Sequence, residues 1–359
     1  MNKPLKILYS HMGHFGFDDE LKILEHESKG EYSVLSLNHR KTLGWTRDVA
    51  PYVLDDLYRN RDENLHNFYV HVKNLCESNE IDVFFVDHEC VYHPDFILEL
   101  KKRVYTVIYS GDDPESSYFR SKPYLYAFDH AFCYGVYHNE HQLMTEKFLE
   151  WGAKRADLRP HGCWSSSYDH SLDDGTIAKK ERDIDIIFVG GAANRSRQDV
   201  LLKLKKTFGS KFHLYGNWGG VRGFCERFRK GYGFIPISKL PHMELLRLYG
   251  RSKIGINIHQ SYGPCNLRLY DLPMNGVMQI CDNLKGLSRI YRLGEEVIGY
   301  ENIAEMHDQI RYYLAHDNER IRIAINGFKK AKEMYLFHTT FFKAMERIKQ
   351  GMMEKAKTV

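Results

Sequence analysis

The chain has 359 residues, of which 43% are hydrophobic and 27% are charged. These fractions are typical of globular proteins and exclude intrinsic disorder as the main state, and the length suffices for two domains with their own cores. The 51 basic and 47 acidic side chains leave a net charge of +4, which is too small to indicate bulk binding to nucleic acid.

The sequence also argues against a membrane span and against disulfides. No stretch approaches the roughly 18 consecutive apolar residues of a transmembrane helix, and residues 1–9 lack the apolar core of a signal peptide. The seven cysteines are scattered, odd in number and without a Cys-x-x-Cys pair, which indicates reduced thiols rather than a disulfide framework or a zinc knuckle. We therefore expect a cytoplasmic protein.

Short apolar runs alternate with helical patterns from the first residues onward. Runs such as 81–86 (IDVFFV) and 104–109 (VYTVIY) have the length and unbroken apolar character of strands buried on both faces of a parallel sheet. A polar stretch at 165–181 predicts a linker, after which the alternation restarts. The predicted strands are 5–10, 33–37, 81–86, 104–109, 131–134, 184–189, 212–215, 254–258 and 277–281.

Two successive β-α-β-α series predict an α/β protein with two doubly wound parallel-sheet domains. Right-handed crossovers gather the carboxyl ends of the strands at one edge of each sheet, where ligands bind, and two such edges facing each other would form a central cleft. The expected parts are an N-terminal domain over 1–165, a linker over 166–182, a second domain over 183–337 and a C-terminal helix over 338–359.

One candidate anion site lies where the predicted strand 184–189 ends. Gly190 and Gly191 would let backbone N–H groups approach an anion, and Arg195 and Arg197 add positive charge at the start of the next helix. The stretch fits neither Gly-x-Gly-x-x-Gly nor the P-loop, which disfavours a dinucleotide-dependent oxidoreductase. It indicates phosphate contact or, equally, a tight turn with solvated arginines.

A second candidate lies between two predicted strands of the second domain. Asn266 can cap a short helix, on which Arg268 and Asp271 lie one turn apart. A diphosphate needs arginine and N–H donors, whereas a ribose or sugar hydroxyl needs a carboxylate acceptor. The alternative is a surface ion pair worth ~0–1 kcal/mol.

Residues 268–276 (RLYDLPMNG) resemble the R-x-F-E-x-x-A-x-G signature of the CgeB-like, group 1 glycosyltransferases. The resemblance extends from about residue 81 to the C-terminus. Its shorter matches, in order, are 93–95 (HPD), 111–114 (GDDP), 188–190 (FVG), 214–216 (LYG), 252–257 (SKIGIN) and 294–297 (GEEV).

This resemblance implies a GT-B fold, in which two Rossmann-like domains hold a nucleotide sugar in the cleft between them. The donor would lie on the C-terminal domain and the acceptor on the N-terminal domain, with the C-terminal helix crossing back to the latter. By the same resemblance Arg268 would contact the diphosphate, and Gly190 and Gly191 would line the donor loop. Asp271 would bind ribose or sugar hydroxyls, at a position where the family usually has Glu.

Glycosyl transfer expels a nucleoside diphosphate, whose negative charge must be stabilised. Asp183 and Asp185 have the Asp-x-Asp spelling by which some glycosyltransferases hold a metal, but they lie at the start of a predicted strand, away from the ligand edge. We therefore expect arginines and helix dipoles to stabilise the leaving group. No metal and no cofactor are expected, and the nucleoside-diphosphate sugar serves as co-substrate.

Three residues are candidates for acceptor chemistry. His14, with His11 as its alternative, follows the first strand, and an imidazole pKa of ~6.5 suits a general base, unless it is simply a surface or hydrogen-bonded histidine. Asp112 and Asp113 follow the strand at 104–109 and would act as base or orient the acceptor, unless they only form an acidic turn.

Tyr215 would stack on a nucleobase or sugar of the donor, or simply pack at its loop.

We therefore predict a metal-independent hexosyl- or pentosyltransferase that acts on a glycan, a surface polymer or a protein. A rival acceptor is a hydroxylated base of phage DNA, which salt-dependent binding to duplex DNA would reveal. A rival from another class is a non-catalytic nucleotide-sugar-binding protein. The donor's base and sugar, the stereochemical outcome and the oligomeric state are left open.

Overall fold

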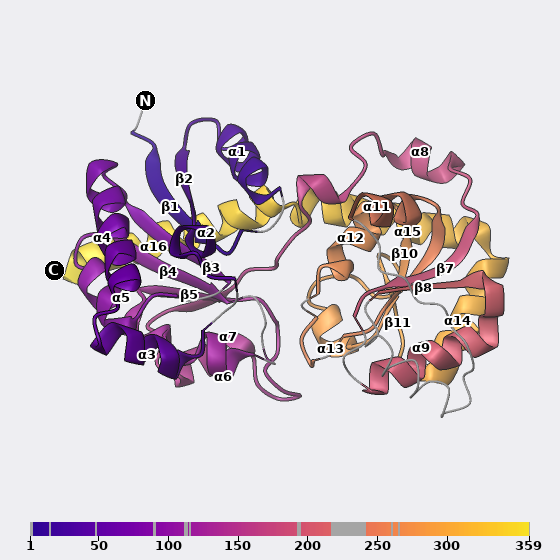
Figure 1. Cartoon of the computed structure of the whole chain (residues 1–359). Helices are drawn as coiled ribbons and strands as arrows, with labels where there is room; N and C mark the ends of the chain where they lie inside the picture. The colour runs from indigo at the N-terminus through magenta and orange to yellow at the C-terminus, as the bar shows by residue number, and fades with distance from the viewer. Residues whose placement is uncertain are drawn as a thin grey trace. The chain divides into compact units, whose positions relative to one another are not determined.

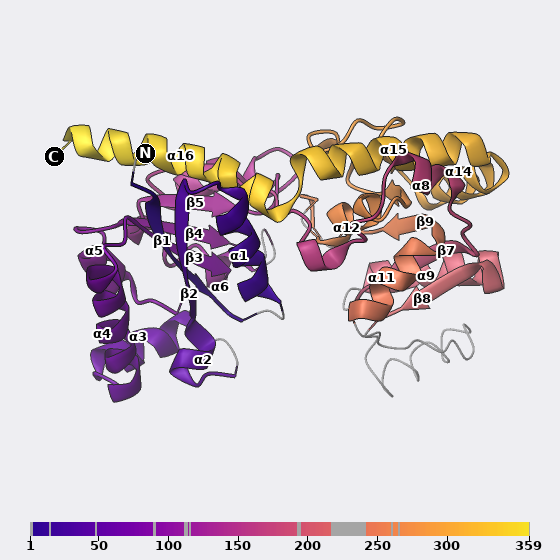
Figure 2. The ribbon, with the colours of Figure 1, turned by 90° about the horizontal axis from the view of Figure 1, so that it is seen from above.

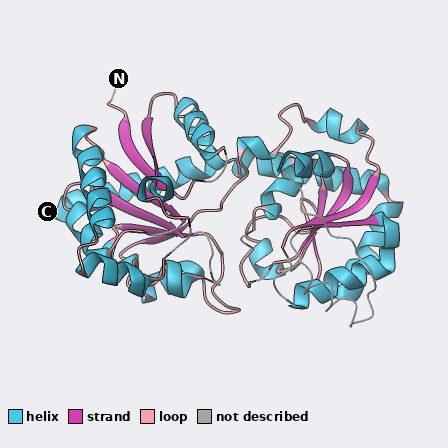
Figure 3. Cartoon of the chain, viewed as in Figure 1, coloured by secondary structure: helices cyan, strands magenta, loops and turns pink. Residues whose placement is uncertain are grey.

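The computed structural model describes residues 3–13, 16–46, 49–88, 91–110, 114, 116–191, 195–216, 242–259, 261–264 and 266–358. The chain divides into two compact units (Figure 1). The first comprises Met1–Gly162, Ser261–Cys265 and Phe337–Val359, and the second comprises Cys163–Gln260 and Asn266–Leu336. Each unit consists of a sheet with helices packed against it (Figure 3).

The first unit is built on a parallel sheet with the strand order β2-β1-β3-β4-β5-β6 in the described part of the chain. The order steps outward in both directions from β1 and β3, as in a doubly wound sheet. The strands are β1 (Leu5–His11), β2 (Tyr32–Asn38), β3 (Val83–His88), β4 (Tyr105–Ser110), β5 (His130–Cys133) and β6 (Ala156–Leu158).

Helices cover both faces of this sheet, so successive strand residues are buried on alternate sides. Figure 2 shows α16 on one face and α3 and α4 on the other. The helices of this unit are α1 (Phe17–Glu27), α2 (His39–Leu43), α3 (Pro51–Arg59), α4 (Glu63–Ser78), α5 (Pro94–Leu100), α6 (Ser117–Arg120), α7 (Met144–Glu150) and α16 (Phe337–Thr358).

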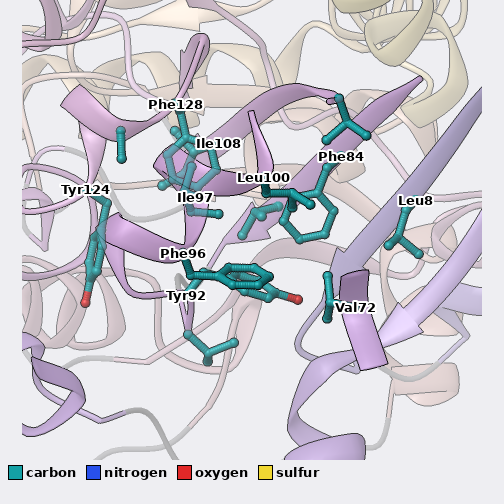
Figure 4. Close-up of a cluster of buried hydrophobic side chains, with 14 of the residues drawn as sticks. Leu8, Val72, Phe84, Tyr92, Phe96, Ile97, Leu100, Ile108, Tyr124 and Phe128 are labelled. Carbon is teal, nitrogen blue, oxygen red and sulfur yellow. The ribbon is translucent and has the colours of Figure 1, made fainter. Parts of the chain in front are cut away.

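The alternation along β1 and β3 shows how both faces are filled. Leu8 and Phe84 belong to the core cluster that α4 and α5 cover, which is drawn in Figure 4. Their neighbours Tyr9 and Phe85 face the other way, where the ring centre of Phe341 in α16 lies 5.8 and 5.5 Å from theirs. The unbroken apolar runs of the sequence therefore correspond to strands buried on both faces.

The second unit has a parallel sheet with the order β11-β10-β9-β7-β8. Its strands are β7 (Ile184–Val189), β8 (Phe212–Tyr215), β9 (Ser252–Asn257), β10 (Met278–Cys281) and β11 (Ile298–Gly299). In Figure 2, α14 and α15 lie on one side of this sheet, and α9 and α11 on the other. The helices are α8 (Asp174–Lys179), α9 (Arg195–Phe208), α11 (His242–Gly250), α12 (Arg268–Met274), α13 (Leu284–Leu287), α14 (Ile303–Ala315) and α15 (Asp317–Met334).

The predicted fold class of two doubly wound parallel-sheet domains is confirmed. The polar stretch predicted as a linker contains α8. Asp173 caps this helix, because its carboxylate accepts the Thr176 N–H at 2.7 Å. Ile177 of this helix is buried against Gly276, where a side chain would approach it to 2.8 Å. The stretch is therefore packed into the second unit. The strands β6 and β11 were not predicted, nor were the helices α1, α2, α3, α6, α8, α13 and α15.

Candidate functional site

Polar side chains gather where β7, β9 and β10 end, at the carboxyl edge of the second sheet. The parallel register pairs Asn257, the last residue of β9, with Cys281, the last residue of β10. The loop after β7 and the first turn of α12 lie at the same edge, because Arg268 reaches both β7 and β9. In parallel α/β sheets this edge is where ligands bind.

Arg268 is the first residue of α12 and is only 9% exposed. Its Nε donates to the Val189 carbonyl and its Nη1 donates to Asn257 Oδ1, each at 2.8 Å. The guanidinium carbon lies 4.3 Å from the centre of the Phe188 ring, and a side chain at Gly190 would collide with Nη2. Burial lowers the pKa of this guanidinium. Arg268, the residue predicted to bind the diphosphate, is therefore held in a fixed direction beside Gly190 of the predicted donor loop.

Asn257 connects Arg268 to the neighbouring strand and to the loop before α12. Its Oδ1 also accepts a hydrogen bond from Asn266 Nδ2 at 2.8 Å, and its Nδ2 donates to Gln279 Oε1 at 2.9 Å. Asn266 in turn accepts the Leu269 N–H at 3.0 Å, as expected of a residue that stabilises the first helical turn. Sequence reasoning included Asn257 only as the last residue of the match at 252–257 and assigned it no role, although a polar amide that interrupts an apolar strand is a recognisable signal.

Asp271 is buried as well, so the alternative of an exposed Arg268–Asp271 ion pair is wrong. Its carboxyl accepts a hydrogen bond from the Cys163 thiol at 3.3 Å. Burial raises its pKa to about 7, although the thiol and the Arg268 charge act in the opposite direction. Near neutral pH this carboxyl can therefore either donate or accept a hydrogen bond.

The alternative of a solvated arginine is also wrong for Arg197, which is 7% exposed. It donates to the carbonyl of Gly191 at 2.9 Å and to that of Ile258 at 2.6 Å, and so ties the loop after β7 to the end of β9. The structure does not describe the side chain of Arg195, which begins α9. Tyr215 ends β8 half-buried, and its carbonyl accepts the Gly190 N–H at 3.0 Å. The prediction that this N–H approaches an anion is therefore wrong for Gly190 in this structure.

His259 and Asp282 also lie at this edge and were not found by sequence reasoning. The imidazole Nδ1 lies 2.7 Å from Asp282 Oδ1, and the Cys281 sulfur lies 3.8 Å from the same nitrogen. These three are the only group of metal-ligand type found among the described residues. The hydrogen bond already uses Nδ1, and burial raises the pKa of the Cys281 thiol well above its ordinary value, which keeps it protonated. The arrangement is that of a hydrogen-bonded histidine–aspartate pair.

The predicted acceptor-side residues His14, Asp112 and Asp113 lie outside the described residues. His11, the alternative to His14, ends β1 and is buried. Its Nδ1 accepts the Gly13 N–H at 3.1 Å and its Nε2 lies 2.9 Å from Ser36 Oγ, so both ring nitrogens have partners. Burial lowers its pKa.

Asp183 and Asp185 lie at the amino end of β7, opposite to the edge described above. Asp183 pairs with Arg251, and Asp185 accepts a hydrogen bond from Lys253 at 2.6 Å. Basic side chains therefore occupy both carboxylates. In the described part of the chain, no helix has the length and apolar character needed to cross a membrane.

A family model described as "Glycosyl transferase-like" matches residues 195–346, which include Arg197, Arg268, Asp271, His259 and Asp282. No curated protein matches the chain. Many solved structures do match it.

Three similar structures cover nearly the whole chain. A glycosyltransferase from Rickettsia africae is 13% identical with a TM-score of 0.64, over 98% of this chain and 99% of its own. Sucrose-phosphate synthase from Thermosynechococcus elongatus is 12% identical with a TM-score of 0.63, over 96% and 98%. Anabaena HepE in complex with UDP and glucose is 11% identical with a TM-score of 0.58, over 96% and 100%. At such identities the likeness establishes the fold, which is the GT-B architecture of two Rossmann-like domains.

Proposed function

We propose that this protein is a glycosyltransferase that moves a sugar from a nucleoside-diphosphate sugar to an acceptor hydroxyl. The observation that carries the proposal is the buried guanidinium of Arg268, held by Val189 and Asn257 at the carboxyl edge of the second sheet. A fixed positive charge at that edge is suited to the charge that develops on a departing diphosphate. The match to the glycosyl transferase-like model includes this residue.

In the proposed reaction the acceptor oxygen forms a bond to the anomeric carbon while the bond from that carbon to the phosphate oxygen breaks. The electron pair of the broken bond leaves with the diphosphate, which Arg268, Arg195 and the N-terminus of α9 stabilise. The acceptor proton passes to a base, for which His14, Asp112 and Asp113 are the candidates, or to the leaving phosphate.

Other residues of the second unit are assigned to holding the donor. Gly190 and Gly191 form the donor loop, Arg197 fixes that loop to β9, and Tyr215 lies beside it. Asp271 binds a donor hydroxyl, and its pKa of about 7 makes that contact sensitive to pH. The resemblance of residues 268–276 to the CgeB-like signature supports the same assignment.

We also propose that no metal takes part, because arginines and backbone N–H groups supply the positive charge at this edge. The acceptor is a hydroxyl of a glycan, a surface polymer or a protein, and a hydroxylated DNA base is the rival. UDP-sugars are the first donors to test, since HepE was solved with UDP and glucose.

The test uses the full chain with UDP-, GDP-, dTDP- and CDP-sugars. The true donor raises the melting temperature by mass action, and the enzyme releases its nucleoside diphosphate with or without EDTA. Arg268→Ala is expected to lower the rate of nucleoside diphosphate release about 100- to 1000-fold. Arg268→Lys keeps the charge but not the two directed N–H groups, so its rate should lie between those of wild type and Arg268→Ala.

Full turnover by folded Arg268→Ala protein would contradict the proposal. Donor binding without release of nucleoside diphosphate would instead support the non-catalytic binding protein. A changed sugar on the recovered nucleotide, with no transfer, would indicate an isomerising enzyme. Loss of turnover in EDTA, restored by a divalent cation, would contradict metal independence alone.

A further inference from the structure

His259 lies two residues beyond the end of β9, and three hydrogen bonds to one carboxylate fix its position. Its backbone N–H donates to Asp282 Oδ1 and Oδ2 at 3.0 and 2.9 Å, and its Nδ1 lies 2.7 Å from Oδ1. Because an ionised carboxylate can only accept, it holds the imidazole proton on Nδ1. The other ring nitrogen, Nε2, then carries a lone pair.

That Nε2 atom is buried and has no hydrogen-bond partner in the structure, and the imidazole side chain is 1% exposed. A buried polar atom without a partner lowers stability, and most buried polar atoms in proteins are paired. The unpaired atom here belongs to a ring that Asp282 orients. This combination is expected where the missing partner is a ligand.

The pair belongs to the same group of side chains as Arg268. The Asp282 N–H lies 3.4 Å from the carbonyl oxygen of Asn257, whose side chain accepts from Arg268. Arg197 donates to the carbonyl of Ile258, the residue before His259. Charged and titratable groups near the imidazole are thus Asp282, the Cys281 thiol, Arg197, Arg268 and the Tyr300 phenol, which interacts with the first three.

We infer that His259 Nε2 accepts a hydrogen bond from a hydroxyl of the nucleotide sugar, with Asp282 as its positioning residue. This inference rests on the proposed function. Phosphate oxygens at neutral pH are acceptors and would repel the Nε2 lone pair, whereas ribose and sugar hydroxyls can donate to it. The hydroxyl belongs either to the ribose or to the transferred sugar. Since Nε2 is covered in the ligand-free protein, binding must also change the surroundings of the ring.

The experiment measures binding of UDP and of UDP-glucose by calorimetry to the full chain and to three variants. His259→Phe removes the acceptor. Asp282→Asn keeps the ring but lets an amide donate to Nδ1, which moves the imidazole proton to Nε2. His307→Phe is the matched control, because His307 in α14 of the same unit also has a buried Nε2 without a partner.

We expect His259→Phe and Asp282→Asn to bind at least tenfold more weakly than wild type, and His307→Phe to bind as wild type. Weaker binding of both ligands assigns the hydroxyl to the ribose, and weaker binding of UDP-glucose alone assigns it to the sugar. Nitrogen-15 NMR of the wild-type imidazole should show the proton on Nδ1 and a shift of Nε2 when the ligand is added.

Unchanged affinity of folded His259→Phe for both ligands would overturn the inference, as would an imidazole proton found on Nε2 of the wild type. If Arg268→Ala still weakens binding in that case, the proposed function stands without this contact. If the wild type binds none of the UDP, GDP, dTDP and CDP sugars, the proposed function and this inference both fail.

Discussion

Each unit buries an arginine next to its parallel sheet, but in different surroundings. In the first unit, Arg159 directly follows β6 and is 1% exposed. Its guanidinium carbon lies 4.5 Å from the ring centre of Tyr109 in β4, and 4.9 and 5.3 Å from those of Phe337 and Phe341 in α16. Arg159 is therefore packed between the sheet and the C-terminal helix, where the Tyr9 hydroxyl and the charge of the buried Asp87 also stabilise its positive charge.

In the second unit, Arg268 touches one ring but is oriented by two oxygen acceptors at the carboxyl edge of the sheet. An aromatic face attracts a cation without fixing the direction of its N–H groups, whereas a carbonyl and an amide oxygen do fix it. The two buried arginines therefore differ in how firmly oxygen acceptors direct the guanidinium and in how many rings surround it.

Replacing Arg159 by alanine should have the largest effect on stability. The change leaves a cavity under several rings, and we expect a loss of ~3–5 kcal/mol in the free energy of unfolding. Arg159→Met should regain only part of it, because an apolar side chain of similar length fills the space but leaves the buried Asp87 without this positive charge. Urea unfolding followed by tryptophan fluorescence measures both. A loss below about 1 kcal/mol for the alanine variant would mean that the rings close over the gap, and would remove the packing role.

Asp271 predicts a pH dependence of the second unit. Its folded-state pKa of about 7 lies above the ordinary 3.8, so the folded state binds the proton more tightly. The protonated carboxyl therefore contributes to the free energy of unfolding fully below about pH 4. This contribution, at most ~4 kcal/mol, is lost as pH rises from about 4 through about 7. Unfolding of wild type and Asp271→Asn should therefore differ between pH 4 and 7. Parallel pH profiles for the two proteins would show that the carboxyl is already ionised.

Gly190 and Gly191 form a matched pair that tests how closely the donor loop fits Arg268. A side chain at 190 would collide with Arg268 Nη2, whereas nothing lies within 4 Å of a side chain at 191. We expect Gly190→Ala to lower stability by ~1–3 kcal/mol and Gly191→Ala to change it by less than about 0.5 kcal/mol. Thermal unfolding measures the difference. Equal effects would mean that the guanidinium moves aside easily and that its direction is not fixed.

The smallest effect is expected at the amino end of β7. Asp183 pairs with Arg251 on the surface, and Asp183→Asn should leave stability and turnover unchanged, with and without added Mn²⁺. A turnover assay at several metal concentrations measures this. Metal-dependent activity that disappears in the variant would show that the Asp-x-Asp spelling has a catalytic use after all.

The amino-acid sequence by itself determined that the chain forms two parallel sheets and which loops lie at their ligand edges. A strand that is buried on both faces of a sheet has an unbroken apolar run in the sequence, such as the run that forms β3. Because the strands are parallel, the residues that follow each run lie at the carboxyl edge of the sheet. The same local reasoning located Arg268 and its capping neighbour Asn266. It missed α8, because a short helix that buries a single isoleucine has no clear periodicity.

Only the tertiary structure decided which polar groups meet. Arg268 and Val189 are 79 residues apart, Cys163 and Asp271 are 108 apart, and His259 and Asp282 are 23 apart. The first and the last of these contacts exist because β9 pairs with both β7 and β10, and strand order is not encoded in any local pattern. Burial, which changes the pKa of Asp271 and leaves His259 Nε2 without a partner, likewise depends on what the rest of the chain places around each side chain.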